Sequence, residues 1–260
     1  MERKTAGFVI IGDEVLSARI AEANLANLLT TFAGSGVAVG EVAILPDDAD
    51  RIATVVRDFA HRFDVVVTTG GVGPTHDDLT WEAVGAAFSR PLALHEEMLR
   101  WMEARNGRPM STEQQRMAWL PVGTEIVQSA PDGRGFMLHL ENVWVLPGVP
   151  AMVRAKIGGI ARRYASAPAW VATARYDVDE WEVVAAIDAT VQAHGDVQIG
   201  SYPIFDATDH RLKLTFVCDD RVAAERALAE ATAGVGSERL VDVVWHGGPA
   251  AIEPSSNNLT

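Results

Sequence analysis

The sequence is poor in cysteine, in basic residues and in long apolar runs. Cys218 is the only cysteine, which excludes an intrachain disulfide, and its place in the alternating run LKLTFVC favours a buried structural role. No apolar run is long enough to cross a bilayer. The apolar run behind the N-terminal MERK is short and meets Asp13 and Glu14 at once, which indicates a first strand and not a signal peptide. We therefore expect a cytoplasmic protein without a membrane partner.

The shortage of basic residues also restricts the partners. Lys and Arg number 22 against 35 Asp and Glu, which gives a formal net charge of -13. Such a field repels nucleic acid, so we expect no nucleic-acid partner. A small phosphorylated ligand is still compatible with this charge, because the backbone N–H groups at a helix N-terminus bind phosphate without any Lys or Arg.

The first part of the chain alternates short apolar runs with amphipathic stretches. Apolar runs at 7–12, 37–45 and 63–71 are typical of buried strands, and the helical spacing of apolar residues predicts helices over 19–33 and 48–61. This alternation predicts an α/β domain over residues 1–166, built as a three-layer sandwich around a mostly parallel sheet.

A second domain follows the segment SAPAW at 166–170. Over residues 170–246 the predicted order is strand, helix, strand, strand, helix, strand, which is the small α+β ferredoxin-like (βαββαβ) arrangement. Residues 247–260 are small, polar and contain Pro and Gly, so we expect a disordered tail.

The turn TGGVGPTHDDLT (69–80) follows the strongest predicted strand. Its glycines at 70, 71 and 73 lack Cβ atoms, which permits a sharp turn and a close approach to a ligand. We expect the next helix to begin near Asp77 or Asp78 and to be capped by Thr75 or Asp77. Its free N–H groups would then face the carboxyl end of the sheet, where ligands bind in open α/β folds.

The same turn is also compatible with a plain connection between strand and helix. The dense polar run THDDLT favours a ligand site, although neither a dinucleotide fingerprint nor a Walker loop is present. His76 fits either a general acid or base or a solvated loop residue, and the sequence leaves both open.

Four carboxylates are expected at one edge of the sheet. Asp77 and Asp78 lie on the turn, and Asp13 and Glu14 follow the first strand. Beside a phosphate these groups would repel one another, and a divalent cation (Mg²⁺, Mn²⁺ or Co²⁺) bridging carboxylate and phosphate oxygens would relieve the repulsion. The alternative is that Asp13 and Asp77 only cap helices while Glu14 and Asp78 are solvated.

The segments GDEVLSARIAEAN, TTGGVGPTHDDLT and VLPGVP, in this order and spacing, resemble the molybdopterin-binding-like domain of the CinA (competence/damage-inducible protein A) family. That domain also occurs in MoaB/Mog-type molybdenum-cofactor proteins and in animal FAD synthase. The resemblance covers residues 5–165. The second domain, including IGSYP at 199–203, is similar to the region that follows this domain in those proteins. We expect the nicotinamide-nucleotide deamidase domain of CinA to be absent.

The resemblance implies a small-molecule nucleotide or a molybdopterin as ligand, metal-dependent cleavage of ADP-ribose or FAD, and a homo-oligomer, dimer or trimer. For such a cleavage we expect catalytic roles for Asp78 and Asp77 and metal binding by Asp13, Glu14, Asp77 and Asp78. The implied ligand-binding residues are Gly70, Gly71, Gly73, Thr75, Thr80, Asn24, Ser17 and Gly148.

The chain departs from the family pattern at three positions. Ala18 stands where Gly is usual, and Glu22 and Ala23 stand where Asn or Asp with Thr are usual. Three functions therefore stay open: a metal-dependent nucleotide pyrophosphatase, a molybdopterin-binding protein of cofactor biosynthesis, and a non-catalytic nucleotide sensor.

Overall fold

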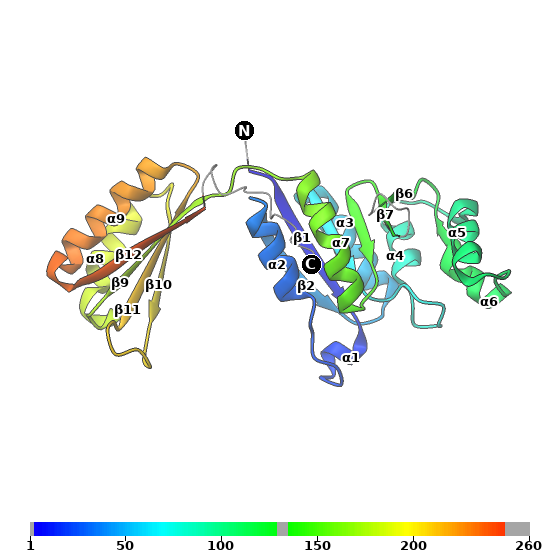
Figure 1. The fold of residues 1–260 in the computed structure, drawn as a ribbon, viewed down its shortest axis with the longest axis horizontal. Coiled ribbons are helices and arrows are strands. Elements are labelled where there is room, and N and C mark those ends of the chain that lie inside the picture. Colours follow the sequence, from blue (N-terminus) through cyan, green and yellow to red (C-terminus); the bar gives the residue numbers. More distant parts are fainter. Residues whose placement is uncertain (1–2, 129–134, 248–260) are drawn as a thin grey trace, which may run out of the picture. The chain divides into compact units, whose positions relative to one another are not determined.

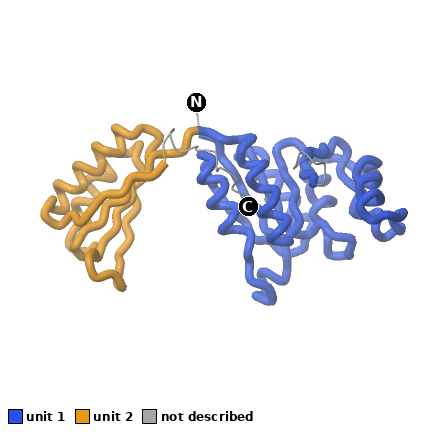
Figure 2. Tube along the Cα trace, viewed as in Figure 1, with its two compact units in different colours: residues 1–166 blue, residues 167–260 orange. Residues whose placement is uncertain are grey.

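The chain divides into two compact units, residues 1–166 and 167–260 (Figure 2). The computed structural model describes residues 3–128 and 135–247. The predicted disordered tail at 247–260 therefore lies outside the described residues, apart from Gly247. No helix in the described ranges combines the length and the apolar character that a membrane span requires.

The first unit is built on a six-stranded sheet in the order β2-β1-β3-β8-β7-β6 (Figure 1). Neighbours from β2 to β8 are parallel, and β7 and β6 are antiparallel. The strands are β1 (Thr5–Ile11), β2 (Ala38–Leu45), β3 (Val65–Thr69), β6 (Glu125–Gln128), β7 (Phe136–Leu140) and β8 (Val143–Leu146). The helices that follow or precede them are α1 (Asp13–Leu16), α2 (Leu25–Gly34), α3 (Ala49–Arg62), α4 (Thr80–Ala87) and α7 (Pro150–Arg163).

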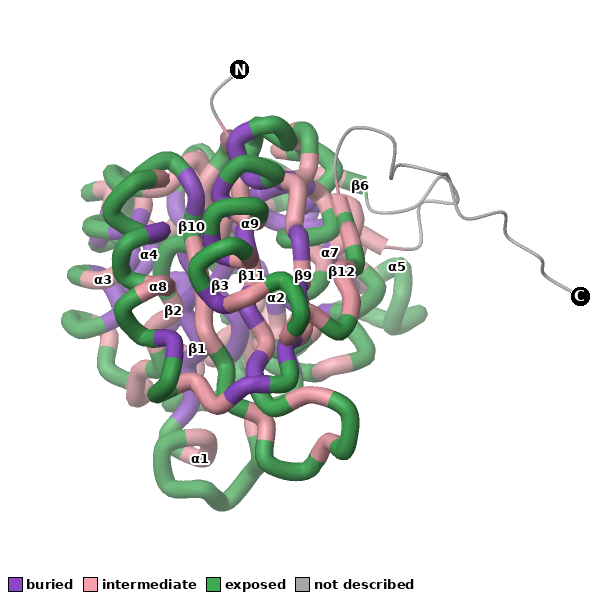
Figure 3. Tube along the Cα trace, turned by 90° about the vertical axis from the view of Figure 1, so that its left-hand side faces the viewer, coloured by how far each residue is buried: buried purple, intermediate pink, exposed green. Residues whose placement is uncertain are grey.

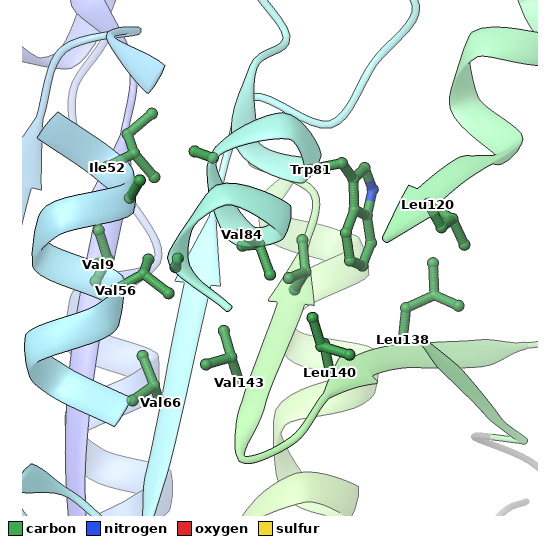
Figure 4. Close-up of a cluster of buried hydrophobic side chains, with 14 of the residues drawn as sticks. Val9, Ile52, Val56, Val66, Trp81, Val84, Leu120, Leu138, Leu140 and Val143 are labelled. Carbon is green, nitrogen blue, oxygen red and sulfur yellow. The ribbon is translucent and has the colours of Figure 1, made fainter. Parts of the chain in front are cut away.

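Helices cover both faces of this sheet. Along β1, Phe8 and Ile10 pack with buried residues of α2 and α7, whereas Val9 and Ile11 pack with those of α3 and α4. Successive side chains of a strand point to opposite faces, so a strand between two helical layers is apolar throughout. Figure 4 shows the α3 and α4 side, where Trp81 lies beside Leu120. The predicted three-layer sandwich with a mostly parallel sheet is confirmed.

The segment between β1 and α2 differs from the prediction. The helix expected over 19–33 begins only at Leu25, and α1 is a separate helix of 4 residues. Ala18 has a φ of 55°, in the left-handed region that interrupts a right-handed helix. The segment is largely exposed (Figure 3).

An insertion between α4 and β6 contains a small two-stranded sheet that the sequence did not indicate. β4 (Leu92–Leu94) pairs antiparallel with β5 (Trp119–Pro121). Between these strands lie α5 (Glu96–Asn106), α6 (Thr112–Gln115) and the 3-10 turn η1 (Arg116–Ala118).

The second unit contains a four-stranded antiparallel sheet in the order β10-β11-β9-β12. Its elements are β9 (Trp170–Tyr176), α8 (Glu180–Ala193), β10 (Gln198–Pro203), β11 (Leu212–Cys218), α9 (Arg221–Val235), η2 (Ser237–Arg239) and β12 (Leu240–Gly247). The chain order of its strands and longer helices is the predicted βαββαβ order, and this sheet has a core of its own around Tyr176 and Phe216.

Candidate functional site

The turn after β3 depends on two glycines for its own packing. Gly70 and Gly71 have φ values of 102° and 62°. A Cβ on Gly70 would lie 2.1 Å from the carbonyl oxygen of Ile11, and one on Gly71 would lie 2.5 Å from Oγ1 of Thr80. Both glycines are therefore required by contacts within the protein, before any ligand is considered.

Thr80 connects this turn to α4. Its hydroxyl donates to the carbonyl of Gly70 at 2.8 Å, and its N–H donates to the carbonyl of Gly71 at 2.9 Å. The helix begins at Thr80, its N-cap is Leu79, and no side chain caps it. We predicted that this helix would begin near Asp77 or Asp78 and be capped by Thr75 or Asp77, and that prediction was wrong. The helix begins later because Thr80 is hydrogen-bonded to the carbonyls of the two glycines. The first turn of α4 consequently begins without a capping side chain, which is the state that accepts an anion.

Asp78 is occupied within the turn. Its carboxylate accepts the N–H of Thr75 at 2.8 Å and also the hydroxyl of Thr75. Asp77 is more exposed, and Oδ1 of Asp77 lies 3.9 Å from Nδ1 of His76, whose side chain is 95% exposed. Asp78 and Thr75 therefore shape the turn, whereas Asp77 and His76 face solvent.

Asp47 joins the acidic residues of the site and was missed by the sequence analysis. It follows β2 as Asp13 follows β1, and its Oδ2 accepts the N–H of Asp13 at 2.9 Å. Partial burial raises the pKa of Asp47. The negative charges of Glu14, Asp13 and Asp77 raise this pKa further. The hydrogen bond from the N–H of Asp13 lowers the same pKa but does not offset these effects. Three of the four predicted carboxylates therefore lie around Asp47.

These carboxylates do not form a closed metal site. In residues 3–128 and 135–247, no group of three or more His, Cys, Asp or Glu residues could hold a metal ion. The hydroxyl of Ser17 donates to the carbonyl of Asp13 at 2.6 Å and so belongs to the α1 segment.

A small recess containing buried polar atoms lies beside Asn24, Thr69 and Gly148. Nδ2 of Asn24 donates to the carbonyl of Gly148 at 2.9 Å, and a Cβ on Gly148 would lie 3.5 Å from the Cα of Gly70. Oδ1 of Asn24 and Oγ1 of Thr69 are buried without a hydrogen-bond partner, and both residues line a cavity of about 80 Å³. Leaving such an atom unpaired costs roughly 1–3 kcal/mol, so the recess favours a molecule that donates hydrogen bonds, water included.

Glu22, one of the residues that departs from the family pattern, is used at the start of α2. Its two carboxylate oxygens accept the N–H groups of Asn24 and Leu25 at 2.7 and 2.8 Å. The N-cap residue Asn24 makes no side-chain cap of its own. Glu22 therefore replaces the missing cap and leaves the side chain of Asn24 directed to Gly148.

Comparison with known proteins gives two family matches. Residues 7–164 match the probable molybdopterin binding domain, and residues 169–244 match the middle domain of FAD synthase. A protein of Archaeoglobus fulgidus is 32% identical over 198 residues, which cover 75% of this chain and 85% of that protein. A CinA-like protein of Desulfosudis oleivorans is 36% identical over 151 residues, 56% of this chain, but the match spans only 37% of that relative's length.

One solved structure supports the fold independently. CinA from Thermoplasma acidophilum, a protein described as having unknown function, aligns with a TM-score of 0.56 at 26% sequence identity. The alignment covers 63% of this chain and 100% of that chain.

Proposed function

This chain belongs to the probable molybdopterin-binding domain family, with CinA-like relatives, and from that premise we propose that it binds and hydrolyses a nucleotide that contains a pyrophosphate. The ligand class is that of ADP-ribose and FAD. The proposal places the pyrophosphate against the uncapped N-terminus of α4 and the hydrolytic groups among the neighbouring carboxylates.

The observation that carries the proposal is the position of Asp47. Burial and repulsion from Glu14, Asp13 and Asp77 raise its pKa. Its Oδ1 also lies close to the glycine turn, 3.6 Å from the position that a Cβ on Gly71 would take. A carboxylate whose pKa is raised toward the working pH is better suited to accept a proton. In the proposed reaction Asp47 accepts the proton of the attacking water, and the uncapped N–H groups of α4 bind the pyrophosphate oxygens.

A divalent cation fits this arrangement only together with the ligand. Mg²⁺ is commonly bound by one or two carboxylates plus phosphate oxygens and not by a cage made of protein alone. Asp77 and Asp78 are the residues that would hold it, with Asp13 and Glu14 adding negative potential. When bound, such an ion supplies Lewis-acid stabilisation to the phosphate.

The test uses the full chain. Purified protein is incubated with ADP-ribose, FAD and related dinucleotides in Mg²⁺, Mn²⁺ and Co²⁺, and AMP is measured by chromatography. We expect AMP release that Asp47→Asn and Asp78→Asn reduce by at least tenfold and that the control Asp48→Asn preserves. Asp48 instead caps α3, by accepting the N–H groups of Asp50 and Arg51, and Asn can also cap. If Asp47→Asn released AMP as fast as the parent protein, Asp47 would not be the proton acceptor.

The second candidate is binding of a molybdopterin without hydrolysis, which the description of the matching family favours. It predicts tight binding of a phosphorylated pterin and no AMP release under any of the three metals. Nucleotide binding without turnover would instead indicate a non-catalytic sensor.

A further inference from the structure

A cavity of about 240 Å³ extends from the glycine turn toward the insertion between α4 and β6. Its lining includes Gly73 and Asp78, which belong to the turn. It also includes Trp119, Met117 and Leu92, which belong to β5, η1 and β4. A ligand whose phosphate lies at the turn therefore has an adjoining compartment for its next group.

The apolar part of the lining of this cavity is suited to a flat ring. Trp81, Met117 and Leu92 supply apolar surface, and Trp119 remains 47% exposed although Ala118 and Leu120 on either side of it are buried. Trp119 is the first residue of β5 and lines the cavity, so a large part of this aromatic side chain is exposed beside it. A partly exposed Trp beside a cavity is the usual platform for stacking a heterocyclic base.

Arg116 is the only basic residue of the cavity lining, where Asp78 and Glu82 are acidic. Within residues 3–128 and 135–247 its side chain takes part in no ion pair or hydrogen bond. A guanidinium group stacks on flat rings and donates hydrogen bonds to their oxygen and nitrogen acceptors. The cavity is smaller than the roughly 300–1,000 Å³ of sites that enclose a drug-sized ligand, so its size suits one ring system and not a whole dinucleotide.

We propose that this cavity binds the planar heteroaromatic ring of the phosphorylated ligand, with Trp119 as the stacking surface and Arg116 at the polar edge of the ring. The inference rests on the proposed phosphate binding at the glycine turn. Residues of the insertion would then distinguish ring-bearing phosphates from ring-free ones. A planar heteroaromatic ring joined to a phosphate occurs in both nucleotides and pterins.

The experiment compares ring-bearing and ring-free probes by calorimetry on the full chain. AMP, FMN and a pterin monophosphate carry rings, whereas pyrophosphate and ribose 5-phosphate do not. We expect at least one ring-bearing probe to bind at least tenfold more tightly than ribose 5-phosphate, and the ranking of the three identifies the ring class. Trp119→Ala should remove that tenfold advantage and leave pyrophosphate affinity unchanged, whereas Trp119→Phe should retain most of it.

Trp181→Ala is the matched control, since Trp181 is an exposed tryptophan, at 76%, of the second unit. Equal affinities for ring-bearing and ring-free probes, or an undiminished advantage in Trp119→Ala, would overturn the ring site while leaving phosphate binding intact. If none of the five probes binds, the ring site and the proposed function both fail. Circular dichroism of each variant separates loss of binding from loss of folding.

Discussion

The carboxylate of Asp47 shows how a site residue can oppose folding. Its pKa in the folded protein is raised above the ordinary value of 3.8, chiefly by burial and then by Glu14, Asp13 and Asp77. Between the unfolded and folded pKa values, the folded state binds more protons than the unfolded state. The free energy of unfolding therefore decreases as the pH rises through this window.

Asp47→Asn should remove this pH dependence. The amide oxygen can still accept the N–H of Asp13, but the charge is gone. We expect the variant to be more stable than the parent at pH 7 by a few tenths of a kcal/mol, since partly exposed charges interact weakly. The difference should disappear below pH 3.8 and shrink in high salt. Urea unfolding at several pH values measures it, and an Asp47→Asn variant less stable than the parent at pH 7 would contradict it.

The residues of the site were partly predictable. The carboxyl ends of parallel strands meet at one edge, which brings Asp13 and Glu14 near Asp77, and the same reasoning applied to the strand at 37–45 would have found Asp47. The pairing of Asp78 with Thr75 was not predictable. It depends on the backbone angles of a glycine turn, which the residue types do not determine.

At the scale of elements, the start of α2 depends on a residue outside the helix. Glu22 accepts two N–H groups there, one of them at Asn24, which provides no cap of its own. Glu22→Ala leaves both N–H groups without this partner. We expect the free energy of unfolding of the first unit to fall by about 1–2 kcal/mol. Glu22→Gln, which keeps one acceptor oxygen, should lose less, and equal unfolding midpoints for all three proteins would refute the capping role.

In the connection from β3 to α4, we expect a substitution at Gly70 to cost more stability than one at Glu22. Gly70→Ala places a Cβ 2.1 Å from the backbone oxygen of Ile11 at a positive φ, and backbone atoms cannot move away as a flexible side chain would. We expect a loss of more than about 3 kcal/mol, or failure to fold. Gly34→Ala is the control, because its Cβ would meet nothing within 4 Å. Thermal unfolding of both variants gives the comparison, and a Gly70→Ala protein as stable as the parent would contradict the tight packing.

Elements were predictable where one physical signal dominates. In the second unit the observed chain order of strands and longer helices is the predicted one. The helix predicted over 19–33 was too long, because apolar spacing continues through residues whose backbone is set by Ala18 and by the Glu22 cap. The pairing of β4 with β5 was missed because strands of 3 residues carry too little periodicity to detect.

On the scale of the whole molecule, the two units have separate hydrophobic cores. Two buried clusters lie on either face of the first sheet, and a third, around Phe216 and Leu214, consists only of residues of the second unit. Cooperative unfolding depends on a shared core, so each unit should unfold with a stability of its own.

Phe216→Ala tests this independence. Phe216 is fully buried, so its loss removes apolar contacts and leaves a cavity, at a cost of about 3–5 kcal/mol. Hydrogen exchange should then accelerate across β9, β10, β11 and β12 and stay unchanged in β1 and β3. Phe32→Ala, which empties an equally buried position in the first unit, should give the reverse pattern. Accelerated exchange in both units from either variant would mean that they unfold as one body. In that case a substitution in the second unit would also destabilise the first unit, including the glycine turn.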